Sequence, residues 1–426
     1  MGKRYRKMER KVNGSIREIR DGHVLLELPL PVAEVLSGIP EAVERMSREA
    51  GLMVVSALLE DECERIAGPK DSKNPLRMAN WWGGDVGPIY YEDRKVAIER
   101  PRVRGKDNKE IPLKTYAAFR DPKGMKRSVM KQMVLGISSR NYEEAVESVI
   151  KGYGIKKSSV SRHFVEATAE QMREFMERDL AGLDLVAIFI DGIEFKGQML
   201  VVALGLDIRG KKHVLGLWQG ATENSAVCTG LLEDLKRRGL DTTKAYLFIL
   251  DGSKALRSAV AKMFGSDAPV QRCQVHKRRN VKEQLPPEHQ NAIDARIRTA
   301  YKMADYAKAK ESLDLTVKYL ERLNPSAAAS LREGLEETLT VHKLGIMGLL
   351  RKTLSTTNPI ESCFSVTRTV TGRVKRWRGG DMLQRWAVAA LLRAEKKFRR
   401  VQGYREIPKL AAVLQQKSLD RKEAAA

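Results

Sequence analysis

The sequence has few cysteines and no long apolar run, and these two shortages exclude several classes of protein. It contains four scattered cysteines in 426 residues, with no Cys-x-x-Cys pair. A disulfide framework and a zinc finger are therefore not expected. No apolar stretch reaches the roughly 18 residues that a membrane span requires, and the basic segment Met1 to Lys11 lacks the apolar core of a signal peptide. We expect a cytoplasmic protein with no membrane partner.

Acidic residues are also scarce relative to basic ones. The chain has 54 Asp and Glu against 77 Lys and Arg, which gives a formal net charge of +23 and a pI near 9.8. A globular protein rarely keeps so much self-repulsion without an extended anionic partner to offset it. The length allows two to four domains and a large core. We therefore expect a multidomain protein that binds nucleic acid.

Three carboxylates stand out against this basic background. Asp191 and Asp251 each follow an apolar run and each precede a glycine. A buried strand that stops on an acid beside a flexible residue holds that carboxylate at the rim of a sheet. A single Asp-Gly after a strand is more often a simple turn, but two matching ones are harder to dismiss. Glu361 adds a third acid at the start of an expected helix that Thr357 opens, and the three together indicate metal-dependent chemistry on nucleic acid.

The first two acids fall in a segment with an α/β pattern. Three strands are expected first, then a helix ended by Gly239, a strand, a helix and a last short strand: Asp184–Asp191, Gln198–Asp207, Lys212–Trp218, Asn224–Arg238, Lys244–Leu250, Ser253–Phe264 and Pro269–Val275. This is the order of elements in the ribonuclease-H-like fold. In that fold the first and fourth strands lie side by side, so Asp191 and Asp251 are expected to meet.

Carboxylates suit the chemistry of a hard divalent cation. Mg²⁺ prefers oxygen ligands in near-octahedral geometry and is usually held by one or two carboxylates, waters and a substrate phosphate. Two such ions about 3.5 to 4 Å apart activate the attacking oxygen and stabilise the leaving oxygen in phosphoryl transfer. One acid shared by both ions, with one further acid for each, meets this need. Two Mg²⁺ or Mn²⁺ ions per active site are expected.

Between the second and third acid lies an expected helical insertion. Three charge-rich segments favour helices and have Pro or Gly at their joints: Pro286–Lys308, Ala309–Leu323 and Pro325–Leu339. The insertion is either a support for DNA strands or a spacer bundle, and the sequence leaves both interpretations open.

The N-terminal third reads as small modules. A helix is expected at Pro40–Ala67, a loop at Gly68–Gly87 and short strands at Lys95–Val103 and Glu110–Tyr116. The strands lie in a basic stretch that resembles a phosphate-contacting ribbon, with Arg100, Arg102 and Arg104 as candidate contacts. The alternative is a solvated surface hairpin.

Next along the chain, a helix-turn-helix is expected from Asn141 to Thr168. The first helix covers Tyr142–Lys151, a glycine turn follows, and serines can cap the second helix. The candidate DNA contacts at the start of that second helix are Lys156, Lys157, Ser158, Ser159 and Arg162. A helical hairpin that only packs against its neighbours is the alternative.

The C-terminal region carries a second basic cluster that includes two tryptophans. Trp377 lies in a basic turn, and with Arg376 and Arg378 it is a candidate DNA contact, because an indole can stack on a base or enter a duplex. Trp386 falls on the apolar side of the expected helix Met382–Leu392 and is assigned to the core.

Several motifs in order resemble the Mutator-type transposases of bacterial insertion sequences. They run from the basic ribbon to the Trp-containing helix: Arg94-Lys-Val, Arg100-Pro-Arg-Val-Arg104, Phe189-Ile-Asp-Gly192, Glu233-Asp234-Leu235 through Arg238-Gly-Leu240, Leu250-Asp-Gly252, Gln271-Arg-Cys-Gln-Val-His276, Thr356-Thr-Asn-Pro-Ile-Glu361 and Gly372-Arg-Val-Lys-Arg-Trp-Arg378.

The resemblance implies a DDE transposase in which Asp191, Asp251 and Glu361 bind two divalent ions. Such an enzyme binds the terminal inverted repeats of its element, cuts there, and uses the freed 3′-hydroxyl to attack target DNA. Family members carry a Cys-x-x-His pair that Cys273 and His276 match, and we interpret it as a support for the site. Asn358 is expected to cap the helix of Glu361 and to brace that acid. A homodimer or larger oligomer on double-stranded DNA, a circular intermediate and a bacterial, nucleoid-associated location are further expectations.

The expected fold is an α/β ribonuclease-H-like catalytic domain with an all-α insertion, preceded by small, mainly helical DNA-binding modules. The expected segments are an N-terminal helical region, a basic β-rich segment, the helix-turn-helix, the catalytic core, the insertion, the C-terminal core helices and a tail, at 1–90, 91–130, 131–180, 181–282, 283–350, 351–402 and 403–426. Two rival functions stay open: a structure-selective nuclease of the same fold, and a DNA-binding regulator without catalysis.

Overall fold

The structure is a computed structural model, and it describes most of the chain. The described residues are 15–20, 23–27, 39–70, 77–91, 94–135, 157–195, 197–220, 224–372, 374, 377 and 381–425, with side chains described for most positions from 47 onward. The chain divides into two compact units, residues 1–167 and 168–426, and each is treated by itself. In the described part, no helix is both long and apolar enough to span a membrane.

The first unit contains a long helix and a three-stranded antiparallel sheet. Its hairpin β1 (Ser15–Arg20) and β2 (His23–Glu27) precedes α2 (Ile39–Ala67). The sheet follows in the order β3 (Ala79–Tyr91), β4 (Arg94–Gly105) and β5 (Glu110–Ile111). Apolar residues of α2 and of the sheet share one core, which includes Leu59, Ile89 and Val103.

Two expectations for this unit were wrong. Residues 79–87 of the expected loop belong to the strand β3, where they pair with β4. Gly87 lets the Tyr116 side chain lie where a Cβ would otherwise be. The expected strand Glu110–Tyr116 is only two residues long and is followed by α3 (Lys114–Arg120). The Glu62 carboxylate accepts hydrogen bonds from the backbone of Lys114 (2.7 Å) and Thr115 (2.9 Å), which satisfies the first donors of α3.

The structure describes only part of the expected helix-turn-helix. Helix α4 (Lys123–Leu135) precedes it, and the first helix and turn of the motif lie outside the described residues. The second helix is α6 (Lys157–Glu177), 21 residues long. It continues past Thr168, where the helix-turn-helix was expected to end, into the segment Thr168–Leu180, for which a helical bridge is the sequence-based expectation.

The second unit contains a mixed sheet of five strands in the order β10-β9-β6-β7-β8. Strands β6 (Leu185–Phe195), β7 (Gln198–Asp207) and β8 (Lys212–Gly220) are antiparallel. Strands β9 (Leu247–Leu250) and β10 (Val270–Arg272) run parallel to β6. The expected meander and the pairing of the first strand with the fourth are therefore confirmed.

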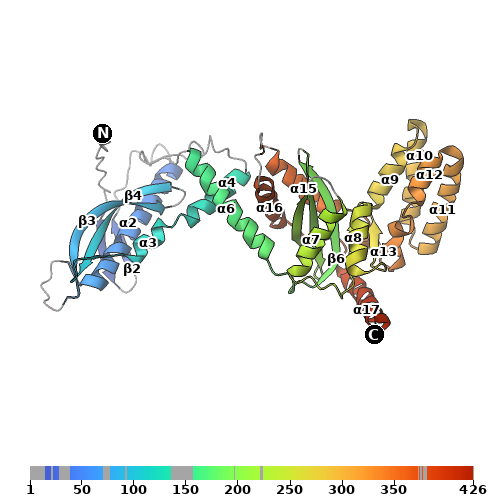
Figure 1. Ribbon diagram of the computed structural model, residues 1–426. Coiled ribbons are helices and arrows are strands. Elements are labelled where there is room, and N and C mark those ends of the chain that lie inside the picture. Colours follow the sequence, from blue (N-terminus) through green and yellow to red (C-terminus); the bar gives the residue numbers. More distant parts are fainter. Residues whose placement is uncertain are drawn as a thin grey trace. The chain divides into compact units, whose positions relative to one another are not determined.

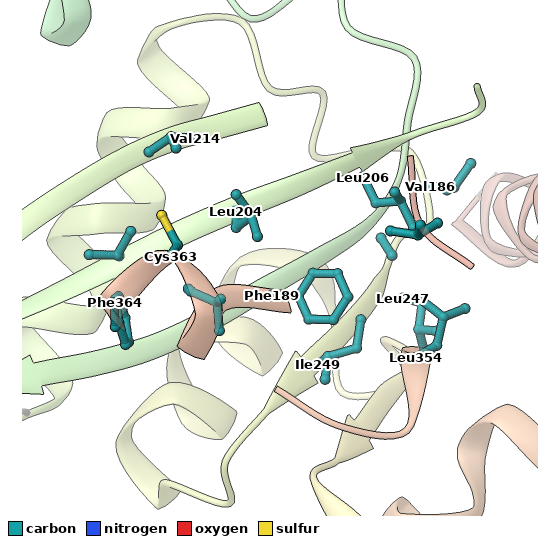
Figure 2. Packing of buried hydrophobic residues seen from close by; sticks show 14 of the residues in the cluster. Val186, Phe189, Leu204, Leu206, Val214, Leu247, Ile249, Leu354, Cys363 and Phe364 are labelled. Carbon is teal, nitrogen blue, oxygen red and sulfur yellow. The ribbon is translucent and has the colours of Figure 1, made fainter. Parts of the chain in front are cut away.

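Alternate residues of the central strands fill two cores. Phe189 and Ile249 point to one face, where they pack with Cys363 and Phe364 of α15 (Asn358–Thr371), as Figure 2 shows. Ile190 belongs to the core of the other face, under α7 (Ser225–Arg237) and α8 (Lys254–Phe264). Helices thus cover both faces (Figure 1), which explains the nearly continuous apolar runs of these strands.

The helical insertion expected after β10 is present. It begins with α9 (Gln274–Glu283) and continues through α10 (Pro287–Lys302), α11 (Tyr306–Leu323) and α12 (Pro325–Arg332) to a 3₁₀ turn, η1 (Glu336–Leu339). These helices enclose a core of their own. The chain then returns to the sheet through α13 (Thr340–Lys343), α14 (Gly348–Leu354), α15, α16 (Met382–Glu395), η2 (Tyr404–Glu406) and α17 (Ile407–Ala425).

Asp234 and Arg238 form a buried ion pair at the end of α7. Arg238 Nη2 lies 2.8 Å from Asp234 Oδ2 and donates a hydrogen bond to the Leu215 carbonyl at 2.7 Å. Burial lowers the pKa of the Arg238 guanidinium, and Asp234 opposes that effect. This motif therefore fixes α7 to β8 and does not contribute to the acidic site.

Replacing Asp234 with Ala is expected to lower the free energy of unfolding by about 3 to 5 kcal/mol, because the buried Arg238 charge would lose its counterion. Urea denaturation followed by circular dichroism measures the loss. The neighbouring Glu233 is exposed, so Glu233→Ala is the matched control and should change stability by less than about 0.5 kcal/mol. Equal losses in both variants would contradict the structural role of the pair.

Candidate active site

Asp191, within β6, and Asp251, directly after the end of β9, lie next to each other. Their preceding residues, Ile190 and Leu250, are direct partners in the parallel pair of β6 and β9, and neighbouring strands are about 4.8 Å apart. Backbone donors fix both carboxylates: Gly192 donates to Asp191 Oδ1 and Ser253 donates to Asp251 Oδ1, each at 2.9 Å. The sheet therefore brings together two acids that are 60 positions apart in the sequence.

One detail of the expected geometry was wrong. Asp191 does not end its strand, since β6 continues to Phe195 and forms a hairpin with β7 through a turn at Gly197. Only the pairing with β9 stops before the acid, because β9 ends at Leu250. Asp191 thus lies at a point of β6 where the neighbouring strand β9 has ended and the neighbouring strand β7 continues. This position buries Asp191 to 8% exposure.

The local environment disfavours a negative charge on Asp191. Burial, and next the charge of Asp251, raise the pKa of Asp191 to about 7, against the opposing effects of His276 and the Gly192 backbone donor. Glu361 also raises this pKa. A cation near these carboxylates would remove the repulsion between them.

Glu361 lies in the first turn of α15, and Thr357 orients it. The Thr357 hydroxyl donates to Glu361 Oε1 at 2.8 Å, and Thr357 itself is fully buried. Helix α15 begins at Asn358, so its N-cap is Thr357, and the Asn358 side chain is exposed. The expected capping by Asn358 was therefore wrong. The sequence offered one signal for Thr357, a threonine two positions before a proline at a helix start.

Cys273 and His276 lie beside Thr357 and Glu361. Cys273 precedes α9, and its backbone N–H donates to the Leu250 carbonyl at 2.7 Å, one residue before Asp251. Its sulfur accepts a hydrogen bond from the Thr357 backbone N–H at 3.4 Å and lies 3.4 Å from the Thr357 hydroxyl oxygen. The His276 ring lies 3.4 Å from the Thr357 hydroxyl through Nδ1 and 3.7 Å from Glu361 Oε1 through Nε2.

The contact between Cys273 and His276 changes their pKa values in opposite directions. A hydrogen bond with Cys273 raises the pKa of His276 to about 9, and Asp191 and Glu361 act in the same direction. Burial raises the pKa of Cys273, but hydrogen bonds from His276 and Thr357 outweigh burial and leave it lowered. His276 is therefore a positive group beside the acids, as a supporting residue would be.

The donor set is suited to a hard cation. Oxygen atoms of Asp191, Asp251 and Glu361 could hold a divalent metal ion, and the repulsion that raises the pKa of Asp191 would be relieved by one. Within the described ranges, no three Asp, Glu, His or Cys side chains already stand in metal-binding geometry.

The structure describes the contacts of some, but not all, of the candidate DNA-binding residues in the first unit. Arg102 donates to Glu110 Oε2 at 2.6 Å, Arg100 lies 3.3 Å from Glu110 Oε1, and Arg104 stacks on Trp82 at 4.2 Å from the ring centre. Arg162 is exposed on α6. Lys156 lies outside the described residues, as do the side chains of Lys157, Ser158 and Ser159.

The C-terminal candidates differ from one another. Trp377 is half-buried and packs on Phe195 of β6, with ring centres 6.5 Å apart. Arg376 and Arg378 lie outside the described residues. Trp386 is buried at 8% exposure within α16, which confirms its assignment to the protein interior.

Comparison with known proteins gives a consistent result. Residues 40–400 match the family described as "Transposase, Mutator family". The segment covered includes the three acids and the Cys-x-x-His pair.

Individual relatives are all transposases of insertion sequences. The chain is 32% identical over 245 residues to the transposase for insertion sequence element IS6120 of Mycolicibacterium smegmatis, which covers 55% of this chain and 72% of that protein. It is 27% identical to the transposase for IS256 in transposon Tn4001 of Staphylococcus aureus, over 64% of this chain and 71% of that one. The chain is 25% identical to the transposase for ISRM5 of Rhizobium meliloti, over 78% of this chain and 82% of that protein.

The raised pKa of Asp191 makes the stability of the metal-free protein depend on pH. Asp191 titrates at about 7 in the folded protein, against an ordinary value of 3.8. The folded state therefore binds more protons between these values, and its free energy of unfolding falls as the pH rises from about 4 to about 7. Asp191→Asn should be more stable than the wild type at pH 8 by a few kcal/mol, on the order of 1.4 per pKa unit, and the difference should vanish near pH 4.

Thermal denaturation in EDTA across this range measures the effect. The control is Asp184→Asn, since Asp184 is exposed just before the same strand. If the difference in free energy of unfolding between Asp191→Asn and the wild type were the same at every pH, the pKa of Asp191 would not be raised in the folded protein.

Proposed function

This chain belongs to the Mutator family of transposases, and from this premise we propose that it binds the terminal inverted repeats of its insertion sequence, cleaves DNA there and joins the freed strand to target DNA. The observation that carries the proposal is the convergence of Asp191, Asp251 and Glu361 from β6, the end of β9 and the start of α15. A DNA-binding regulator would have no need of this arrangement.

We also propose that the second unit is a ribonuclease-H-like catalytic domain. The strand order β10-β9-β6-β7-β8, with three antiparallel strands and two parallel ones, supports this. So does the break in the sheet after β10, where the helical insertion enters before α15 returns with Glu361. The first unit, with the proposed helix-turn-helix and basic strands, would supply the DNA-binding modules.

Two Mg²⁺ or Mn²⁺ ions, when bound, would supply a Lewis acid for the attacking oxygen and another for the leaving oxygen. Asp191 would hold both ions, and Asp251 and Glu361 would each hold one. The Gly192 and Ser253 backbone donors keep the two aspartates in place. Because Asp191 is buried between strands, its carboxylate has little freedom to turn away from the reacting phosphate.

Thr357 and His276 act on Glu361 in this proposal. The Thr357 hydroxyl fixes one carboxylate oxygen, and Cys273 fixes Thr357 from the other side. His276, positively charged, limits the repulsion among the three acids before DNA binds. Both residues are positioning residues, since neither is proposed to touch the DNA.

Strand joining requires two ends to be held together, so we propose a homodimer or larger oligomer on DNA. A circular intermediate is favoured by analogy with the family. A nuclease of the same fold would use the same acids but would yield cleaved strands without joined products, so the products of the reaction separate the two functions.

The three acids can be tested with near-isosteric variants. Asp191→Asn, Asp251→Asn and Glu361→Gln should each reduce cleavage and joining at least a hundredfold while DNA binding persists, because a carboxylate that binds the ion is lost. The substrate is a labelled duplex that carries the DNA bordering the reading frame, incubated with Mg²⁺ or Mn²⁺ and analysed on a denaturing gel. Asp184→Asn is the control and should retain activity. An Asp191→Asn protein with normal activity would refute the proposed site.

Thr357 can be tested by separating its hydroxyl from its shape. Thr357→Val should lower the rate about 10-fold to 100-fold and raise the Mg²⁺ concentration needed for half-maximal rate, as is usual for residues that orient metal ligands. Thr357→Ser keeps the hydroxyl and should restore most of the rate. If Val and Ser variants of equal thermal stability had equal rates, the hydroxyl would have no positioning role.

A further inference from the structure

A cavity of about 480 Å³ opens beside the Asp251 turn, between the catalytic sheet and the insertion. Its lining begins at Leu250 and Gly252, the two neighbours of Asp251, and includes the first turn of α8. On the other side it is lined by Glu333, Gly334 and Glu337 of the insertion. The cavity is thus adjacent to the acidic site but is formed by different side chains.

Three cations and two carboxylates meet in this cavity. Arg257 Nε lies 2.8 Å from Glu337 Oε1, and Arg272 Nη2 lies 3.2 Å from Glu333 Oε2. Lys254 reaches Glu333 only at 3.9 Å, and its side chain is 92% exposed. Glu333 is also approached by the buried Lys277 at 3.8 Å. The two carboxylates therefore face more cations than they can neutralise, and positive charge remains at the N-terminal end of α8, where the helix dipole adds to it.

Arg272 is built into the cavity wall. It is 7% exposed, and two glycines with positive φ, Gly252 and Gly334, lie against its guanidinium. A Cβ at Gly334 would lie 2.7 Å from Arg272 Nη1, and one at Gly252 would collide with Nε. Nε is buried and has no hydrogen-bond partner among the described residues. A buried donor without an acceptor calls for an explanation, and an absent anionic ligand is one.

We propose that this cavity binds a backbone phosphate of the DNA strand, next to the phosphate that lies at the three acids. The inference rests on the proposed function, because it assumes that a DNA strand passes Asp251. Lys254 would contact the phosphate first, and Arg257 and Arg272 would approach it from the cavity wall. Glu333 and Glu337 would hold these cations in position in the free protein and be exchanged in part for the phosphate when DNA binds.

This arrangement gives the helical insertion a role in DNA binding. Its two glutamates set the charge of the subsite and Gly334 leaves space for Arg272. A mere spacer between β10 and α15 would have no need of three ion pairs directed at the turn that carries Asp251.

The salt dependence of DNA binding tests the subsite without requiring cleavage. Each phosphate contact contributes about 0.9 to the slope of log K against log of salt concentration for duplex DNA. Lys254→Gln should reduce the slope by about 0.9, so that its loss of affinity between 50 and 200 mM salt is about threefold smaller than that of the wild type. The titrations use the full chain, EDTA and a duplex that carries the DNA bordering the reading frame.

Lys262→Gln is the matched control. Lys262 is exposed on the same helix, about 12 Å further along its axis and away from the cavity lining. Its slope should equal that of the wild type. Equal slopes for Lys254→Gln and Lys262→Gln would overturn the proposal. Because Lys254 is almost fully exposed, its variant is expected to fold normally, and unchanged thermal denaturation verifies this.

A second experiment locates the phosphate. Methylphosphonate linkages, which carry no charge, are placed one at a time around the cleavage position of the same duplex. One position should weaken binding by the wild type severalfold and weaken binding by Lys254→Gln clearly less, since that variant has already lost one of its contacts to this phosphate. Additive effects at every position would overturn the subsite.

The two proposals fail in different ways. A wild type that shows the expected slopes but never cleaves with Mg²⁺ or Mn²⁺ would refute the proposed catalysis and leave the subsite in place. A wild type that cleaves and joins DNA, with a Lys254→Gln slope equal to that of the control, would refute only the subsite.

Discussion

The parallel pairing of β6 with β9 is the constraint on which the rest of the site depends. It places Ile190 opposite Leu250, and the next residue of each strand is an acid. The pairing is stabilised from both faces, because Phe189 and Ile249 are buried under α15 while Ile190 and Phe248 are buried under α7 and α8. A one-residue slip would turn these side chains to the opposite faces. The register therefore sets the position of both carboxylates, and the apolar packing sets the register.

The sequence predicts those parts of the structure that local patterns determine, and it does not predict parts that depend on contacts between residues far apart in the chain. Strands of the main sheet are buried on both faces and read as apolar runs, so their order and the meeting of Asp191 and Asp251 could be predicted. The strand β3 could not, because its Gly-rich, Trp-rich composition is typical of a loop and its pairing with β4 is not visible in the local pattern. Helix α3 was missed for a similar reason, since its first donors are satisfied by Glu62, about 50 positions earlier. Local patterns carry no information about such contacts.

The same limit applies inside the site. Cys273 and His276 were selected from the resemblance to the family, because their spacing alone is not specific, and Glu361 was selected from its place at a helix start. The role of Thr357 could not be predicted, because it depends on Cys273. The Cys273 sulfur contacts Thr357 from 84 positions away in the sequence. Asn358 was chosen on capping preference, but the helix begins one residue earlier than that assignment required. Because the helix start differs by one residue from the expectation, Thr357 and not Asn358 contacts Glu361.

The insertion is connected to the five-stranded sheet beside Asp251. Cys273, at the start of α9, bonds to Leu250, and Arg272 contacts Glu333 at the far end of the insertion. Buried polar contacts of Gln271 with Thr338 and Val341 join the same two regions. The contacts that hold the insertion therefore lie beside the turn that carries Asp251. Asp191, in contrast, lies within β6, whose pairing with β7 and β9 does not involve the insertion. The two aspartates are thus positioned by different parts of the chain.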